Sequence, residues 1–137
     1  MGRRTSTIVM ALAAGACAAA SAQTRQTPQL ANPASVNCTQ KGGALRLERR
    51  ADGAEYGVCV FTDNRQCEEW AMFLGECPVG GLRVTGYITA AARYCAITGG
   101  RYAVMAGSGT TDEQGVCSLP GGKACDACAY YAGSCGR

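Results

Sequence analysis

The chain of 137 residues contains no histidine. This absence removes the commonest general base, the commonest metal ligand and every Ser-His or Cys-His nucleophile arrangement. A pair of carboxylates could still hydrolyse a substrate, but the two groups must face each other about 5–10 Å apart across a groove. Glu68 and Glu69 are adjacent and diverge on a helix, so we expect surface carboxylates that complement the helix dipole. The sequence therefore predicts no catalytic site.

Patterns that bind phosphate or metal are lacking as well. No Gly-x-Gly-x-x-Gly run follows a strand, and residues 107–110, although rich in glycine, lack the lysine of a phosphate loop and are expected to form a hairpin turn. The Cys-x-x-Cys from Cys125 to Cys128 has no second pair and no histidine, so it is an incomplete zinc ligand set. We expect no metal and no cofactor, and a protein that is not an enzyme.

Long apolar segments are also missing. Residues 7–20 form an uncharged, alanine-rich run that is shorter than the about 20 residues a membrane span needs. Two arginines precede the run and Ala20-Ser21-Ala22 ends it, so residues 1–22 are expected to be a signal peptide that is cleaved before Gln23. An alternative is lipidation at Cys17, which would make the protein an outer-membrane lipoprotein. We expect the chain in the periplasm or outside the cell.

Neither sign of charge dominates. Without residues 1–22 the chain carries 11 basic and 10 acidic residues, a net charge of +1. Its densest basic patch, at Arg46, Arg49 and Arg50, lies among acidic residues and is expected to be a solvated hairpin. This balance gives no electrostatic reason to expect nucleic acid or an anionic membrane as a partner.

Cysteine, in contrast, is abundant, with nine of the ten cysteines after residue 22. At this density in an exported chain, cysteines indicate a disulfide framework. The steps along the chain are 21, 8 and 10 residues in a first set of four and 22, 8 and 10 in a second. The sets are Cys38, Cys59, Cys67 and Cys77, and then Cys95, Cys117, Cys125 and Cys135. Three pairings are open within each set.

Glycines recur at matching positions, which extends the repeat beyond cysteine. Gly42-Gly43 aligns with Gly99-Gly100, and Gly57 with Gly115. Because only glycine adopts positive φ at low cost, the same turns are expected in both copies. The sequence predicts a disordered lead, a first cysteine-rich module, a linker and a second module, at residues 23–30, 31–77, 78–87 and 88–137.

Each module is predicted to be α+β, with a helix, a β-hairpin and a second helix. Asn32-Pro33 favours a helix start, and the first helix is expected to run through Lys41. Alternation at residues 45–48 and a turn at Asp52-Gly53 predict the hairpin. The second helix is expected at residues 65–74, with one buried face made of Cys67, Trp70, Ala71 and Leu74. Units this short bury little apolar surface, so disulfides are expected to stabilise them.

The first module resembles a bacterial family, domain of unknown function 333. The resemblance lies in Asn32-Pro33, Gly42-Gly43, Gly57-Val58-Cys59 and Cys67-Glu68-Glu69-Trp70-Ala71. The second copy is similar but degraded, since it lacks the Asn-Pro opening and has Cys128 where the first has Trp70. Members of that family are often labelled hemolysins. The resemblance implies export, often as envelope lipoproteins, and no established biochemical activity.

Cys128 has no counterpart in the first set of cysteines. If eight cysteines pair, it is left over as a free thiol, takes an alternative local pairing or links two chains in a disulfide dimer. A Cys-x-x-Cys at a helix start can also act as a redox centre. A thiol-disulfide oxidoreductase that uses Cys125 and Cys128 is therefore the alternative from another functional class.

The preferred interpretation is a non-enzymatic binding or structural protein of the cell envelope. Its partner is expected to be an envelope or extracellular protein or polymer. A specific form of this hypothesis is an inhibitor of an extracellular hydrolase, because rigid stapled turns bind without a large ordering cost. The candidate contact residues lie in two turns, Asp63, Asn64 and Arg65 in the first module and Gly121, Gly122 and Lys123 in the second.

Overall fold

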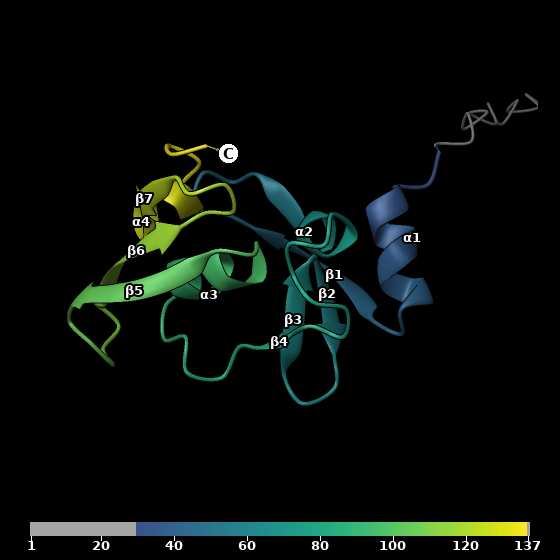
Figure 1. Cartoon of the computed structure of the whole chain (residues 1–137), viewed down its shortest axis with the longest axis horizontal. Coiled ribbons are helices and arrows are strands. Elements are labelled where there is room, and N and C mark those ends of the chain that lie inside the picture. The colour runs from purple at the N-terminus through teal and green to yellow at the C-terminus, as the bar shows by residue number, and fades with distance from the viewer. Residues whose placement is uncertain (1–29, 137) are drawn as a thin grey trace, which may run out of the picture.

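A computed structural model describes residues 30–136 of the chain. The predicted signal peptide and the alternative lipidation site Cys17 lie outside the described residues. Within them, two small antiparallel sheets are each accompanied by two helices (Figure 1). The α+β fold class, with two small disulfide-stabilised units, is thus confirmed.

The first unit contains helix α1 and a four-stranded sheet of order β1-β2-β3-β4. Asn32 caps α1, because its side chain accepts a hydrogen bond from the Ala34 amide, and Pro33 takes the first helical position as predicted. Gly42, at a φ of 83°, ends this helix. The elements are α1 (Pro33–Gln40), β1 (Ala44–Arg49), β2 (Glu55–Phe61), β3 (Arg65–Glu68), α2 (Glu69–Phe73) and β4 (Leu82–Arg83).

The second unit repeats this order without a fourth strand. Thr89 caps its first helix through the Ala92 amide, at the position that aligns with Asn32. Its sheet has the order β5-β6-β7, with a bulge between Val104 and Ala106. The elements are α3 (Ala90–Ile97), β5 (Arg101–Ala106), β6 (Gln114–Ser118), β7 (Ala124–Asp126) and α4 (Ala127–Tyr131).

The predicted helix at residues 65–74 is wrong in its first half. Arg65–Glu68 is a strand that pairs with β2, and only Glu69–Phe73 is helical. Asp63 and Asn64 adopt φ values of 57° and 54° in the three-residue turn between Phe61 and Arg65, which returns the chain along β2. In the second unit, residues 124–126 likewise form a strand, which pairs with β6. Each module is therefore a helix, a three-stranded meander and a single-turn helix.

The segment 78–87, expected as a linker, takes part in the fold. Leu82 and Arg83 pair with Gln66 and Arg65 as the edge strand β4. The next residue, Val84, is buried with Val58 of the first unit and Ile97 of the second. The connection between the copies is therefore held by both of them.

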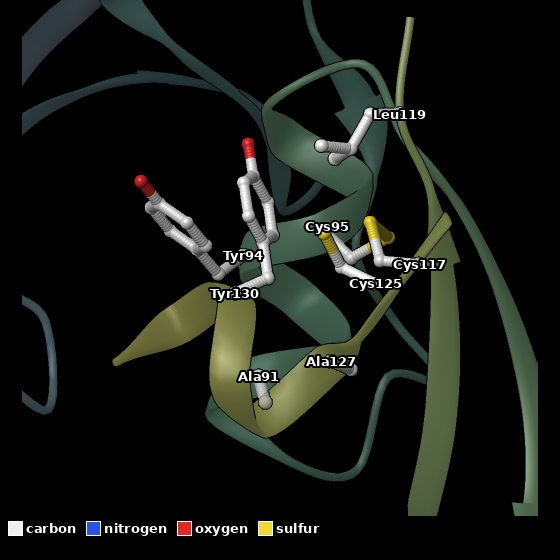
Figure 2. Packing of buried hydrophobic residues seen from close by; sticks show 8 residues of the cluster. All are labelled: Ala91, Tyr94, Cys95, Cys117, Leu119, Cys125, Ala127 and Tyr130. Carbon is white, nitrogen blue, oxygen red and sulfur yellow. A yellow bond between two sulfur atoms is a disulfide. The ribbon is translucent and has the colours of Figure 1, made fainter. Parts of the chain in front are cut away.

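Four disulfides lie at the centres of the two units. They join Cys38 to Cys59, Cys67 to Cys77, Cys95 to Cys117, and Cys125 to Cys135, with the same connectivity in both copies. Figure 2 shows the core of the second unit, where Cys95, Cys117 and Cys125 gather to one side of the rings of Tyr94 and Tyr130, with Leu119 above them. Sulfur thus occupies space that larger apolar side chains fill in bigger domains.

Candidate functional site

The acidic pair of the first unit is buried. Both carboxylates were expected on the surface, and that prediction is wrong. Glu68 caps α2, where its side chain accepts hydrogen bonds from the amides of Trp70 and Ala71. Glu69 points the other way and accepts hydrogen bonds from Asn32 Nδ2 at 3.1 Å and Ser35 Oγ at 2.5 Å, so it ties α2 to the start of α1. These acids hold the fold together.

Glycine at position 57 makes room for this carboxylate. A Cβ at Gly57 would lie 2.5 Å from Cδ of Glu69, a separation that carbon atoms do not tolerate. In the second copy the aligned residues are Gly115 and Ala127, and the ring of Tyr102 takes the space, 2.3 Å from where a Cβ of Gly115 would stand. The repeated glycine serves close packing in both copies, against a carboxylate in one and a ring in the other.

A polar clamp joins the two copies. Arg93 of α3 donates hydrogen bonds to both carboxylate oxygens of Glu48 on β1, one of them at 3.3 Å, and to Oε1 of Gln66 at 2.7 Å. The hydroxyl of Tyr56 donates to Glu48 at 3.0 Å. Burial by itself would raise the pKa of Glu48, but the hydrogen bonds and charge of Arg93, together with Tyr56, lower this pKa below its ordinary value. Glu48 therefore stays ionised and paired at neutral pH.

Tyrosine rings extend the same contact. The rings of Tyr56 and Tyr94 meet edge to face at 5.0 Å between centroids, and Tyr94 also packs on Tyr130 and Tyr131. The hydroxyl of Tyr131 donates a hydrogen bond to the carbonyl oxygen of Arg49 at 3.0 Å. The β1–β2 hairpin of the first unit thereby covers the helical face of the second, and the two units form one body.

Stability should fall in acid as the clamp loses its charge. The folded pKa of Glu48 is depressed, so its contribution is present above the unfolded value near 4.5 and disappears as pH falls through the folded pKa. Glu48→Gln should cost about 1 kcal/mol of unfolding free energy at pH 7. Denaturant titrations of both proteins should show this difference shrinking towards pH 3. A difference that is equal at both pH values would contradict the assignment.

The helix α2 exposes apolar side chains that were expected in the core. Trp70 is 39% exposed and Leu74 61% exposed, so the predicted buried face is wrong for both. Trp70 packs edge to face on Phe73, which is also exposed, at 5.7 Å between ring centroids. Ala71 and Met72 are the residues of this turn that enter the core. Val36 of α1 is exposed as well, and we call Val36, Trp70, Phe73 and Leu74 the apolar face of the first unit.

Trp70→Ala should therefore be a mild change. A buried tryptophan would cost about 3–5 kcal/mol on truncation, whereas this half-exposed ring with one aromatic neighbour should cost about 1–2 kcal/mol. The melting temperature by near-ultraviolet circular dichroism measures the effect. A loss above 3 kcal/mol would show that the ring is more deeply packed than its exposure indicates.

The Cys-x-x-Cys of the second copy is not a disulfide. Cys125 is bonded to Cys135, while Cys128 is exposed and carries a free thiol. The aligned Cys67 is bonded to Cys77 in the same way, which marks Cys125 as a member of the structural framework. A redox pair of Cys125 and Cys128 would first have to break this framework.

The six candidate contact residues lie in two separate turns. The side chain of Asn64 donates a hydrogen bond to Thr85 Oγ1, and that of Arg65 donates one to the carbonyl oxygen of Gly81. Lys123 donates a hydrogen bond to the carbonyl oxygen of Gly136. Gly121 and Gly122 both take a φ of 93°. Lys123 lines a small open depression together with Glu76, Leu119 and Pro120, and no residue of the first turn lines it. The structure therefore does not bring the two turns into one site.

Within residues 30–136, no three histidine, cysteine, aspartate or glutamate side chains cluster in a way that would hold a metal ion. No helix in this part of the chain has the length and hydropathy needed to cross a membrane.

The fold and its contacts define a class, a tandem pair of small α+β modules built around two disulfides each. The family described as Domain of unknown function (DUF333) matches the chain twice, at residues 29–76 and 86–134, and the chain belongs to this family. The sequence is 33% identical over 42 residues to uncharacterized protein YdbJ of Escherichia coli strain K12 and to the protein of the same name in Escherichia coli O6:H1. That match covers 31% of this chain and 48% of each relative, so the chain spans about half the length of the curated relatives it matches. No solved structure matches.

Proposed function

We propose that this chain is an exported binding or structural protein of the bacterial cell envelope that performs no catalysis. The observation that carries the proposal is the pairing of all eight repeated cysteines in four disulfides. Such bonds form and persist in oxidising compartments such as the periplasm, whereas cytosolic thiols are kept reduced. Four disulfides in so short a chain fit a periplasmic or extracellular protein.

The roles of the acidic residues support binding over catalysis. The side chains of Glu48, Glu68 and Glu69 are each committed to a cap, an ion pair or a helix contact. Carboxylates that are held in this way stabilise the fold and are not poised to exchange protons with a substrate. The polar clamp and the tyrosine contact make the modules one rigid body, which can present a surface without ordering it first.

Two other hypotheses lead to different expectations. A thiol-disulfide oxidoreductase would need Cys125 and Cys128 as a pair, but Cys125 is bonded to Cys135. An inhibitor of an extracellular hydrolase would insert a turn, and the turn at Asp63-Asn64 is tight and anchored through Asn64 to Thr85. Insulin reduction by the purified protein should be absent and unchanged in Cys128→Ala, which separates the redox hypothesis from the other two.

Intact-mass analysis of the protein from fractionated cells tests the proposal. We expect it in the periplasm or medium with Gln23 as its first residue, or with an acylated Cys17 if it is a lipoprotein. Without reduction one thiol should be alkylated, and reduction should add about 8 Da for the eight hydrogens that four disulfides lack. A cytosolic protein that keeps residues 1–22 and has all cysteines reduced would refute it.

The hemolysin label of the family calls for its own measurement. Membrane-active proteins need a large apolar face on a sizeable amphipathic element. The apolar face of the first unit rests on helices of eight and five residues. We expect no dye release from liposomes at concentrations where the protein is folded, and release that depends on Trp70 would overturn this part of the proposal.

A further inference from the structure

The contact between the two copies runs in one direction only. The β1–β2 hairpin of the first copy covers the α3–α4 face of the second through Glu48, Tyr56 and the carbonyl group of Arg49. Because the copies are repeats, the same contact could be made once more at each end. The α1–α2 face of the first copy is the aligned receiving surface, and the β5–β6 hairpin of the second copy is the aligned donor. Within residues 30–136, apolar side chains on both surfaces stay exposed.

The receiving surface of the first copy differs from that of the second in both directions, because Asn37 stands where the second has Tyr94, while an apolar residue replaces its cation. The cysteine alignment places Phe73 at the position of Tyr131 and Leu74 at that of Ala132. It also places Val36 at the position of Arg93, the cation of the clamp. Phe73 and Leu74 are 45% and 61% exposed, and Val36 is exposed on α1, the helix that packs against α2.

The free hairpin carries the matching change. In the first copy Glu48 pairs with Tyr56 across the hairpin. Tyr56 aligns with Gln114, which pairs with Ala106 in the second copy. Glu48 therefore aligns with the bulge that contains Met105 and Ala106. Met105 is 70% exposed and its neighbour Val104 is exposed as well. The internal contact thus joins an acid to a base, while both free surfaces are apolar at those positions. At the ring pair of Tyr56 and Tyr94 both free surfaces carry an amide instead, Gln114 and Asn37, so each exchange on one surface is matched on the other.

We propose that a second copy of this chain is the partner, bound head to tail, with the β5–β6 hairpin of one molecule on the α1–α2 face of the next. Figure 1 shows α1 and the β5–β6 hairpin at opposite ends of the long axis of the molecule. Two different surfaces that meet in this way form a heterologous contact, which continues into an open chain or a ring. The inference extends the proposed function without depending on export, because it rests on the geometry of the repeat.

The difference between a charged and an apolar pair also prevents the contact within one molecule from exchanging with the contact between molecules. If the β1–β2 hairpin of one molecule bound the apolar face of another, Glu48 would be buried against Val36 and would keep only Arg46 of its own strand as a cation. If the β5–β6 hairpin displaced the internal contact, Arg93 would lose its carboxylate. Each mismatch desolvates a charged group and removes its partner on the other copy, which is unfavourable. The internal contact is therefore maintained while the ends associate.

Sedimentation velocity over a concentration series tests the proposal. The full chain is used with Cys128→Ser, so that disulfide-linked dimers do not contribute. We expect the weight-average sedimentation coefficient to rise with concentration. Leu74→Glu on the receiving face and Met105→Glu on the hairpin should each leave only monomers. Ile88→Glu, at an equally apolar and half-exposed position between the modules, is the matched control and should associate like the parent.

Mixing the two defective variants gives the decisive result. The Leu74→Glu chain keeps an intact hairpin and the Met105→Glu chain keeps an intact receiving face, so an equimolar mixture should form a one-to-one dimer and nothing larger. A parent chain that is monomeric at every concentration would overturn the proposal. That result would be expected if the N-terminal residues or another partner cover the face. Loss of association in Leu74→Glu alone, with Met105→Glu unaffected, would indicate a symmetric dimer and would also overturn it. Unchanged circular dichroism spectra verify that both variants fold.

Discussion

Replacing Cys38 and Cys59 together with alanine is expected to lower the free energy of unfolding by about 3 kcal/mol. This disulfide closes a loop with a sequence separation of 21 residues, and the chain-entropy model assigns about 3 kcal/mol to a loop of that length. Both sulfur atoms are also fully buried, so their removal leaves a cavity in a core that contains few other large side chains. The first unit should be the part that unfolds.

Guanidinium titrations of the double variant and the parent measure this effect. Cys128→Ala is the matched control, because that cysteine is exposed and unbonded, and its unfolding midpoint should not move. The corresponding change of Cys95 and Cys117, with a separation of 22 residues, should cost a similar amount. A double variant of either pair that keeps the parent midpoint would show that the disulfides are not what stabilises these units.

Gly43→Ala should be nearly as damaging, at about 2–3 kcal/mol. A Cβ at this position would lie 2.3 Å from Sγ of Cys59 and 3.0 Å from Sγ of Cys38, so the added methyl group overlaps the disulfide. The backbone at Gly43 does not need positive φ, which separates this packing effect from the conformational role of Gly42. Gly136→Ala is the control, since nothing lies within 4 Å of the added carbon there and φ is ordinary.

A double-mutant cycle makes the prediction about Gly43 specific. In a chain that already lacks Cys38 and Cys59, both sulfur atoms are gone, and Gly43→Ala should cost less than about 1 kcal/mol. The two changes should therefore be strongly non-additive in thermal or denaturant unfolding. Additive losses would show that alanine acts on the backbone at position 43 and not on the bond beneath it. Gly100 meets Cys117 in the same way in the second copy, at 2.6 Å.

The repeated glycines show how sequence and structure relate in this protein. The alignment of Gly42-Gly43 with Gly99-Gly100 correctly indicated a shared local structure. The first glycine of each pair has positive φ, as the turn argument predicted, with values of 83° and 86°. The second has a different reason, the disulfide below it, which no local pattern could indicate. That contact depends on which cysteines pair, and the spacing left three pairings open.

Helix periodicity misled the prediction for residues 65–74. Cys67, Ala71 and Leu74 lie at helical spacing, but strand β3 takes the first four residues because the turn at residues 62–64 returns the chain along β2. The same register points Glu69 inwards, where its carboxylate accepts hydrogen bonds from Asn32 and Ser35, and it leaves Trp70 at the surface. An acid far along the chain from its hydrogen-bond partners carries no local sign that they exist.

By itself, the sequence determined the class of this protein: two cysteine-rich copies, their glycine turns, the start of the first helix and a leftover Cys128. Those features are local, since spacing, capping and backbone freedom act over a few residues. Only the tertiary structure decided the disulfide pairing, the burial of Glu69 and the clamp between Glu48 and Arg93. Each of these joins residues that are distant in the chain. The disulfides and Glu69 connect elements that pack together within one copy, and the clamp forms because the first copy packs its hairpin on the helices of the second.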